Sequence, residues 1–336
     1  MTQHAISDIA WYRDPVAVDS GLPGICHSFV ASLATALNHI HGELDPVWLM
    51  GTCTFAFRIV VNETFCPSAM SVFDWNAVLP AAVENTGHRC TYITRLWDEE
   101  NLEVERKQEA HEAILAALRD DRPSVVWDVA DTEWGLIVGY DDSAGEYVAL
   151  SHAGDKVELP VDKLGRNGIN VLSVAIPGQP NGRSRKAAVR TALEIAVRHA
   201  EGKEWMERPR YQDGLAAFDL WSILYERGAL LAEAGKAEKV GPDIPRFMAY
   251  YAAHYFSARW YAGRFLLAVA DGDRNLENAA KHCDEAASYL KLVWEESLRM
   301  NSLDDPDLLK RHGQHIADAG RAERAAIEAI KNWLAG

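Results

Sequence analysis

The first residue that suggests chemistry is a cysteine at the start of an apolar segment. The stretch DSGLPGICHSFVASLATALNHIHG (19–42) runs through a turn rich in Gly and Pro into Cys26. A thiol is a useful nucleophile as its thiolate, and a helix N-terminus favours that anion through unpaired N–H groups and the helix dipole. The same N–H groups could stabilise an oxyanion. Cys26 therefore fits a catalytic nucleophile, provided that a helix starts there.

The same cysteine could instead be a core thiol. Cys26, Phe29, Leu33 and Leu37 recur at three- and four-residue steps, which predicts one buried face of a helix that ends at Gly42. Free cysteine is among the most frequently buried residue types. The residues of this segment leave both interpretations open.

Four further polar residues are candidates for a site. Asp128 ends the stretch VVWD, where we expect a turn or cap residue unless its side chain faces the cysteine. Glu133 lies at a loop-to-strand junction, so it could be a solvated charge at the sheet edge or a site residue. His152 is followed by a turn, so it could be a surface histidine or a catalytic one. Arg58, in FAFR, could hold a substrate carboxylate, although a structural salt bridge is the expected role.

The elements that would position these residues mix helices and strands. Helices are expected over 26–41, within DWNAVLPAAVENTGHRCTYIT (74–94) before a strand, and within KQEAHEAILAALRDDRP (107–123). Strands are expected over 124–129, 134–140, 146–152 and 169–176, with a hairpin turn at DDSAG. This order predicts an α+β domain.

The second half of the chain is helical throughout. Its apolar periodicity predicts helices over 184–200, 211–234, 243–270, 275–299 and 305–334. Asp304 and Asp305 before Pro306 are typical of a capped helix start. The stretch IPGQPNGRSRK (176–186) is typical of a linker. The sequence therefore predicts two domains, over 1–178 and 184–336.

Composition narrows the class of protein. The chain has 336 residues, of which 48% are hydrophobic and 25% charged, as in globular proteins. Its net charge of −15 argues against nucleic-acid binding, and no apolar run is long enough for a membrane span. The five cysteines (26, 53, 66, 90 and 283) form no CxxC pair, and the N-terminus resembles no signal peptide. We expect a cytoplasmic protein without disulfides, metal or cofactor.

Three stretches carry a resemblance to a known family. They are LPGICHSFVASLATALNHIHGELDPVWLMG (22–51), GTCTFAFR (51–58) and RPSVVWDVADTEWGLIVGYDDSAGEYVALSH (122–152). Together they resemble the N-terminal domain family of butirosin biosynthesis protein H, within the papain-like superfamily of cysteine peptidases and acyltransferases. The likeness covers about residues 18 to 176. It implies a papain-like first domain, followed by a helical one.

The resemblance also implies a reaction. The best-understood member of the family transfers an acyl group from a carrier-protein thioester to an amine, and the related peptidases cleave leader peptides. Both use a cysteine, a histidine on the central strand and an Asp or Asn one strand later. The histidine moves the thiol proton, and the carboxylate fixes the tautomer of the histidine.

The chain departs from that pattern at the partners of the cysteine. Glu133, beside Trp134, occupies the family's histidine place, and Ser151 or His152 occupies the place of the Asp. The superfamily's oxyanion-hole Gln corresponds to Asp19 or Ser20. Three alternatives stay open at this point. His152 could reach the cysteine, oriented by Glu133 or Asp128; His27 or His88 could serve instead; or the domain is no longer a cysteine enzyme.

The sequence thus predicts a cysteine-dependent acyltransferase or amide-forming enzyme of bacterial secondary metabolism. The alternatives are a cysteine hydrolase of amides or peptides and a catalytically silent binding module. The expected partners are a small-molecule amine or acyl substrate, an acyl carrier protein and a second copy of the chain. The predicted catalytic residues are Cys26, His152, Glu133 and Asp128, and the predicted substrate-binding residues are Ser20, His27, Arg58 and Trp134.

Overall fold

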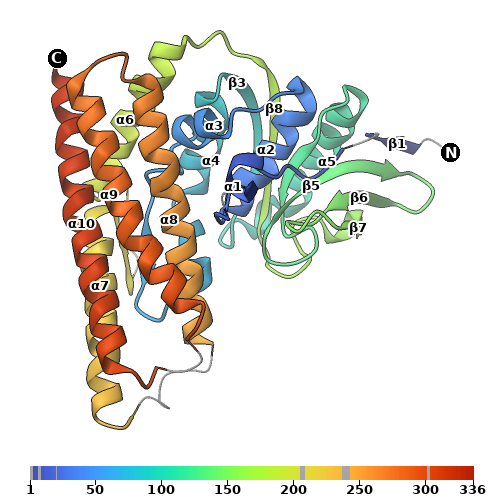
Figure 1. Ribbon diagram of the computed structural model, residues 1–336. Helices are drawn as coiled ribbons and strands as arrows, with labels where there is room; N and C mark the ends of the chain where they lie inside the picture. Colours follow the sequence, from blue (N-terminus) through green and yellow to red (C-terminus); the bar gives the residue numbers. More distant parts are fainter. Residues whose placement is uncertain (1–2, 7–8, 20, 205–208, 237–242, 301–302) are drawn as a thin grey trace. The chain divides into compact units, whose positions relative to one another are not determined.

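The chain forms two compact units that interleave along the sequence. The computed structural model describes residues 3–6, 9–19, 21–204, 209–236, 243–300 and 303–336 (Figure 1). The sheet unit comprises Met1–Val16, His27–Leu49 and Trp75–Arg185, and the helical unit comprises Ala17–Cys26, Met50–Asp74 and Lys186–Gly336. The last crossing between the units, after Arg185, lies at the end of the stretch 176–186 that was predicted as a linker, but residues 176–180 of that stretch belong to a strand. Two segments of the first half nevertheless group with the C-terminal helices.

The sheet unit is built on an antiparallel sheet, so the predicted α+β class is confirmed. Its strand order is β3 (His88–Arg95), β8 (Leu172–Pro180), β4 (Ser124–Trp127), β5 (Trp134–Asp141), β6 (Glu146–Leu150) and β7 (Lys156–Pro160). The short β1 (Gln3–Ala5) pairs with the end of β5, beyond the part of β5 that pairs with β4. Strands β4 to β7 form a meander, and β8 returns to lie between β3 and β4. Strand β7 was not predicted from the sequence.

Helices cover both faces of this sheet. They are α2 (Ser28–His41), α4 (Trp75–Asn85) and α5 (Glu103–Arg119). The Phe29 ring of α2 packs edge-on against Trp134 of β5, with ring centroids 5.1 Å apart. His111 of α5 instead packs against Tyr147, 5.8 Å between centroids. Because Leu150 lies opposite Leu136 in the β5–β6 ladder, Tyr147 points to the face opposite that of Trp134. Helices α2 and α5 therefore lie on opposite faces.

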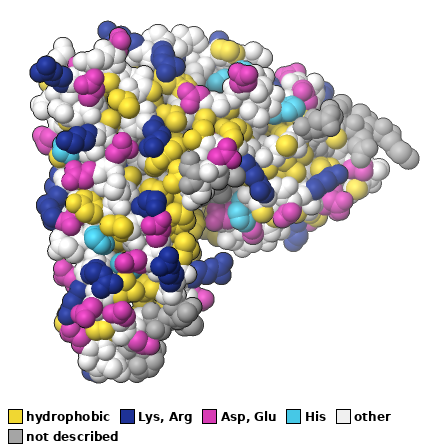
Figure 2. Space-filling model, in the orientation of Figure 1, with side chains coloured by type: hydrophobic (Ala, Val, Ile, Leu, Met, Phe, Trp, Pro, Cys, Tyr) yellow, Lys and Arg dark blue, Asp and Glu magenta, His cyan; other side chains and the backbone are white. Residues whose placement is uncertain are grey.

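Five long helices make up most of the helical unit, as the sequence predicted. They are α6 (Arg185–Ala200), α7 (Gly214–Glu233), α8 (Ile244–Val269), α9 (Arg274–Ser297) and α10 (Pro306–Ala335). Helix α9 packs against α8 and α10, and α10 also packs against α7, so these four run side by side (Figure 1). The predicted cap at Asp305 is confirmed, because its Oδ1 accepts from Leu308 N at 2.9 Å. Figure 2 shows acidic and basic side chains interspersed along these helices.

The remaining elements are short. They are α1 (Pro15–Asp19), α3 (Pro46–Thr52), β2 (Val60–Asn62), β9 (Tyr211–Asp213) and three 3₁₀ turns at Pro67–Ser71, Glu100–Leu102 and Val161–Lys163. Strands β2 and β9 pair antiparallel within the helical unit. This small ladder was not predicted, because each strand has three residues and its partner lies far along the chain. It joins the 50–74 segment to the chain just before α7.

A buried ion pair stabilises the helical unit. Arg259 of α8 donates to Glu323 of α10 through two nitrogens, at 3.0 and 2.9 Å, and the arginine is fully buried. The same guanidinium donates to the carbonyl oxygen of Arg58 at 2.8 Å. A bidentate pair with further backbone partners satisfies both buried charges. Arg259 thus links two long helices and the 50–74 segment.

The variant Glu323→Ala should destabilise the protein by about 3–5 kcal/mol, because it leaves the Arg259 charge buried without its carboxylate. Chemical unfolding followed by circular dichroism measures this change. Glu328→Ala on the same helix is the matched control, since Glu328 is largely exposed in its pair with Lys331. The control should cost less than about 1 kcal/mol. Equal losses in the two variants would contradict this role for the buried pair.

Candidate functional site

Cys26 lies outside the helix that it was predicted to open. Helix α2 begins at Ser28, and His27 is its N-cap, with Nδ1 accepting from Phe29 N at 3.3 Å. The cysteine therefore precedes the cap. The sequence placed the helix start too early because histidine is not among the usual N-cap residues. The predicted C-cap is confirmed, since Gly42 has a φ of 83°.

The thiol of Cys26 lies among backbone carbonyl groups. Its Sγ is 3.6 Å from the Gly24 carbonyl oxygen and 3.9 Å from that of Ala253 in α8. Burial raises the pKa of this thiol to about 12, which a hydrogen bond with Ser257 offsets only in part. Among the residues that the structure describes, no imidazole or carboxylate hydrogen-bonds to this sulfur. A thiol that donates to carbonyl groups stays protonated at neutral pH, so this environment does not activate Cys26.

Iodoacetamide at pH 7 should therefore alkylate Cys26 no faster than Cys283, which is buried and has a raised pKa as well. Cys66 is partly buried, but its 3.0 Å contact with the Ser68 hydroxyl is exposed, so it serves as the internal reference and should react first. The rate at Cys26 should rise with pH towards about 12, where its thiol ionises. Peptide mass spectrometry after timed labelling measures all three cysteines. Preferential labelling of Cys26 at neutral pH would contradict a protonated thiol.

A different nucleophile–base pair lies in the sheet unit. The hydroxyl of Ser28, the first residue of α2, donates to Glu133 Oε2 at 2.5 Å. The same oxygen of Ser28 accepts from the backbone N–H of Trp134 at 3.3 Å. The start of α2 is thereby joined to the start of β5. Ser28 was not among the predicted site residues. Its preference for helix starts would have identified it, had the helix start been placed correctly.

Glu133 has the electrostatic environment of a general base. Burial raises the pKa of its carboxyl group, while the hydrogen bond from Ser28 and the nearby His152 act in the opposite direction. His152 Nδ1 lies 3.2 Å from Asp131 Oδ2, and both side chains are about half exposed. The predicted residues Glu133 and His152 thus lie in one cluster, with Asp131 and Ser28 as members that were not predicted. We call Ser28, Glu133, His152 and Asp131 the α2–β5 cluster.

Asp128 holds the loop beside this cluster. Its carboxylate accepts from Gly168 N at 2.6 Å and from Ile169 N at 2.7 Å, and its own N–H donates to the Glu133 carbonyl group at 2.9 Å. Its φ of 63° places it in the left-handed region, which Asp tolerates better than most residues. These contacts correspond to the turn role that the sequence left open. Asp128 therefore fixes the backbone that leads into Glu133.

Aromatic rings form a rigid base behind the cluster. Trp134, fully buried, lies 5.0 Å from Trp75 and 5.2 Å from Trp127 between ring centroids. Phe29, next to Ser28 in the sequence, contacts the same Trp134 ring. Trp134 was predicted to bind substrate, but it packs within the core of the sheet unit. It holds Glu133 and Ser28 in position through their neighbours in the chain.

The other predicted binding residues have structural contacts or lie outside the described residues. Arg58 is buried in the helical unit, where its Nη1 lies 3.0 Å from Glu204 Oε2 and its guanidinium lies near the Phe55 and Phe73 rings. This is the salt bridge that the sequence favoured. His27 is the buried N-cap of α2. Ser20 lies outside the described residues.

No known protein family and no curated protein matches this chain significantly. The roles of its residues therefore rest on geometry. None of the helices in the described ranges is long and apolar enough to cross a bilayer. Within the same ranges, no group of three or more His, Cys, Asp and Glu side chains is arranged to hold a metal ion.

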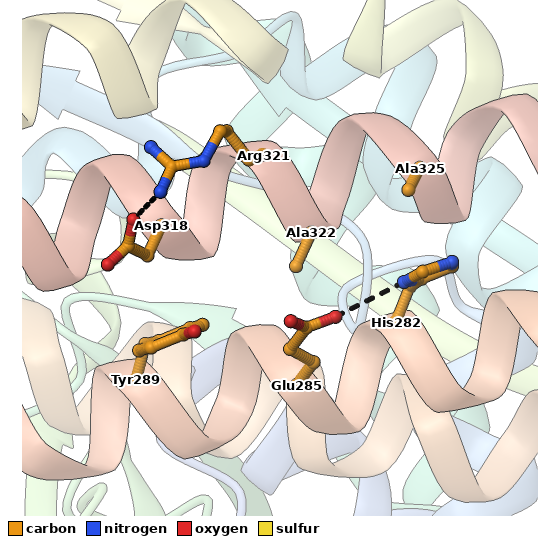
Figure 3. Close-up of a pocket in the computed structure, with 7 residues that line it drawn as sticks. All are labelled: His282, Glu285, Tyr289, Asp318, Arg321, Ala322 and Ala325. Atoms are coloured by element: carbon orange, nitrogen blue, oxygen red, sulfur yellow. Dashed lines mark hydrogen bonds and ion pairs between the residues drawn. The ribbon is translucent and has the colours of Figure 1, made fainter.

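A groove between α9 and α10 is a second candidate site (Figure 3). It has an empty volume of about 420 Å³, open to solvent, with Ala322 and Ala325 among its lining residues. Its charged side chains already pair within their own helices. His282 lies 3.2 Å from Glu285 on α9, and Arg321 pairs with Asp318 on α10. The groove contains no nucleophile beside a base, so the α2–β5 cluster is the better candidate.

Proposed function

We propose that this chain is an acyl-transferring enzyme in which Ser28 is the nucleophile and Glu133 its general base. The 2.5 Å contact between Ser28 Oγ and Glu133 Oε2 carries the proposal. A nucleophile hydrogen-bonded to a base of raised pKa, with further polar groups beside the base, is the arrangement that activates hydroxyl groups in enzymes. The reaction class follows the resemblance to papain-like acyltransferases. The nucleophile differs from the one that the sequence predicted.

The fold of the sheet unit is consistent with this assignment. In the papain-like family that the sequence resembles, a helix carries the nucleophile and the central strand carries the base. Here α2 starts with Ser28, and Glu133, which occupies the family's histidine place, directly precedes β5. The proposed base thus lies next to the start of this strand. Its partner is a hydroxyl two residues after the cysteine.

The proposed reaction has two steps. Ser28 Oγ attacks the carbonyl carbon of an ester, thioester or amide, and its proton passes to the Glu133 carboxylate. The tetrahedral adduct collapses, the bond to the leaving group breaks, and that group takes the proton from Glu133. An amine or water then attacks the acyl-serine, gives a proton to Glu133 and releases the acyl product. Ser28 Oγ regains that proton.

His152 and Asp131 act on the base in this scheme. His152 is among the groups that favour the charged form of Glu133, and Asp131 contacts its imidazole through Nδ1. Both are half exposed, whereas Ser28 is buried, so the substrate approaches from the side of His152. We keep an amine as the proposed acceptor and a carrier-protein thioester as the proposed donor, as in the resembled family. Hydrolysis of the same acyl-serine is the alternative.

An acyl adduct should form on Ser28 when the protein is treated with an activated p-nitrophenyl ester. Ser28→Ala should abolish the adduct and lower ester turnover by about 10³-fold or more, because the bond-forming oxygen is lost. Cys26→Ala should keep both. Ser32→Ala, a buried hydroxyl on the same helix, is the matched control. Intact-mass and peptide mass spectrometry locate the adduct.

Two results would overturn this assignment. An adduct on Cys26 that disappears in Cys26→Ala would restore the cysteine enzyme predicted from the sequence. Normal folding with no adduct on either residue would leave a catalytically silent module, in which the Ser28–Glu133 contact only joins α2 to β5. Preference for an added amine over water, read from the product, separates the transferase from the hydrolase.

The pH profile should identify Glu133 as the base. Activity needs the ionised carboxylate, so the rate should rise with pH through a pKa above the ordinary value for glutamate of about 4.3. Because His152 favours the charged form of Glu133, His152→Ala should move this rise in rate to higher pH. Glu133→Gln should remove the rise together with most of the activity. His111→Ala, in α5 on the opposite face, is the control. An unchanged pH profile in His152→Ala would contradict this effect of His152 on Glu133.

A further inference from the structure

Two histidines meet at another edge of the sheet unit. His41 is the last residue of α2, and His88 is the first residue of β3. Their Nε2 atoms lie 2.7 Å apart, and their ring centroids are separated by 4.8 Å with the planes tilted by 34°. The two imidazoles thus point their Nε2 atoms at a common point. Such a pair is self-consistent when one Nε2 carries a proton and the other has a lone pair.

The neighbours of His88 decide which tautomer it adopts. The Thr86 hydroxyl donates its single proton to the Val83 carbonyl group at 2.6 Å. Its oxygen, 3.0 Å from His88 Nδ1, must therefore accept the proton of that nitrogen. Neutral His88 then has its lone pair on Nε2, and His41 Nε2–H donates to it. A hydrogen bond that fixes the remote nitrogen is the usual support of a metal-binding histidine.

The two histidines differ in exposure, since His88 is partly buried. The His41 side chain is exposed, which leaves one side of the pair open to solvent.

We propose that His41 and His88 bind one divalent late transition-metal ion of the Cu²⁺ or Ni²⁺ type through their Nε2 atoms. The ion takes the place of the proton between the two Nε2 atoms. His41 gives up that proton to solvent and takes one up at Nδ1, so both imidazoles stay neutral and no net proton is released. Water completes the coordination, since the described residues supply no third metal-ligating side chain here. The site is independent of the proposed acyl transfer, because Ser28 lies at the other end of α2, about 20 Å away along the helix axis.

The geometry favours this type of ion over a tetrahedral one. With metal–nitrogen bonds of about 2.0–2.1 Å, two ligands at a right angle lie about 2.9 Å apart, and two tetrahedral ligands lie about 3.3 Å apart. The observed separation of 2.7 Å is closer to the right-angle value. Tetragonal coordination by nitrogen and oxygen is typical of Cu²⁺ and Ni²⁺. Small rotations of the exposed His41 ring would accommodate the difference.

Titration of the untagged, full-length protein with CuCl₂ tests the site. All variants carry His4→Ala, so that the N-terminal segment offers no competing imidazole. One equivalent of Cu²⁺ should bind, with an electron paramagnetic resonance spectrum split by two nitrogens. His41→Ala and His88→Ala should each weaken binding by at least about tenfold, because one ligand cannot chelate. Thermal unfolding verifies that the variants are folded.

His39→Ala is the matched control. His39 lies on the same helix within one turn of His41 and contacts Asp121 at 3.2 Å, away from the pair, so its loss should leave Cu²⁺ affinity unchanged. Thr86→Val should weaken binding less than removal of a ligand. It removes only the hydrogen bond that fixes the tautomer of His88, and both imidazoles remain. If folded His41→Ala or His88→Ala binds Cu²⁺ as tightly as the His4→Ala parent, the proposal is overturned. A single-nitrogen spectrum in the parent protein would overturn it as well.

Discussion

The hydrogen bond between Ser28 and Glu133 sets the local structure on which the candidate site depends. It joins two elements that are 105 residues apart in the chain, the first turn of α2 and the start of β5. A hydrogen bond to a charged group contributes about 1.5–3 kcal/mol, which offsets part of the cost of burying the carboxylate. The aromatic contact of Phe29 with Trp134 continues the same junction into the core. Polar and apolar contacts thus fix one register of α2 on the sheet.

Two possible nucleophiles lie two residues apart in this chain, and their partners separate them. The Cys26 sulfur lies near carbonyl oxygens, which accept a hydrogen bond from the thiol and disfavour the thiolate. The Ser28 oxygen has a carboxylate as acceptor and a backbone N–H as donor. A carboxylate can take the proton, whereas an amide carbonyl cannot. Intrinsic reactivity favours the thiol, but the environment favours the hydroxyl.

The sequence allowed the long elements to be predicted, but not the contacts between them. The five helices after residue 184 follow from apolar periodicity and from caps such as Asp305, and the strands of the meander follow from β-branched runs. The start of α2 was misplaced because His27 caps it through a ring nitrogen. Strand β7 and the β2–β9 ladder are short and depend on distant partners. Burial of Glu133 and the mutual contact of His41 and His88 arise from the tertiary fold, which local patterns do not encode.

The dipole of α2 links the two proposed sites. Its positive N-terminal end, at Ser28, lies beside the Glu133 carboxylate, and its negative C-terminal end, at His41, would lie beside a bound cation. Helix ends favour charges of the opposite sign by about 0.3–1 kcal/mol when exposed, and by more when partly buried. At the first end, this term favours the ionised base that acyl transfer needs. At the second end, it favours a metal ion over a neutral pair. A single helix of 14 residues therefore gives each end the electrostatic sign that its proposed chemistry requires.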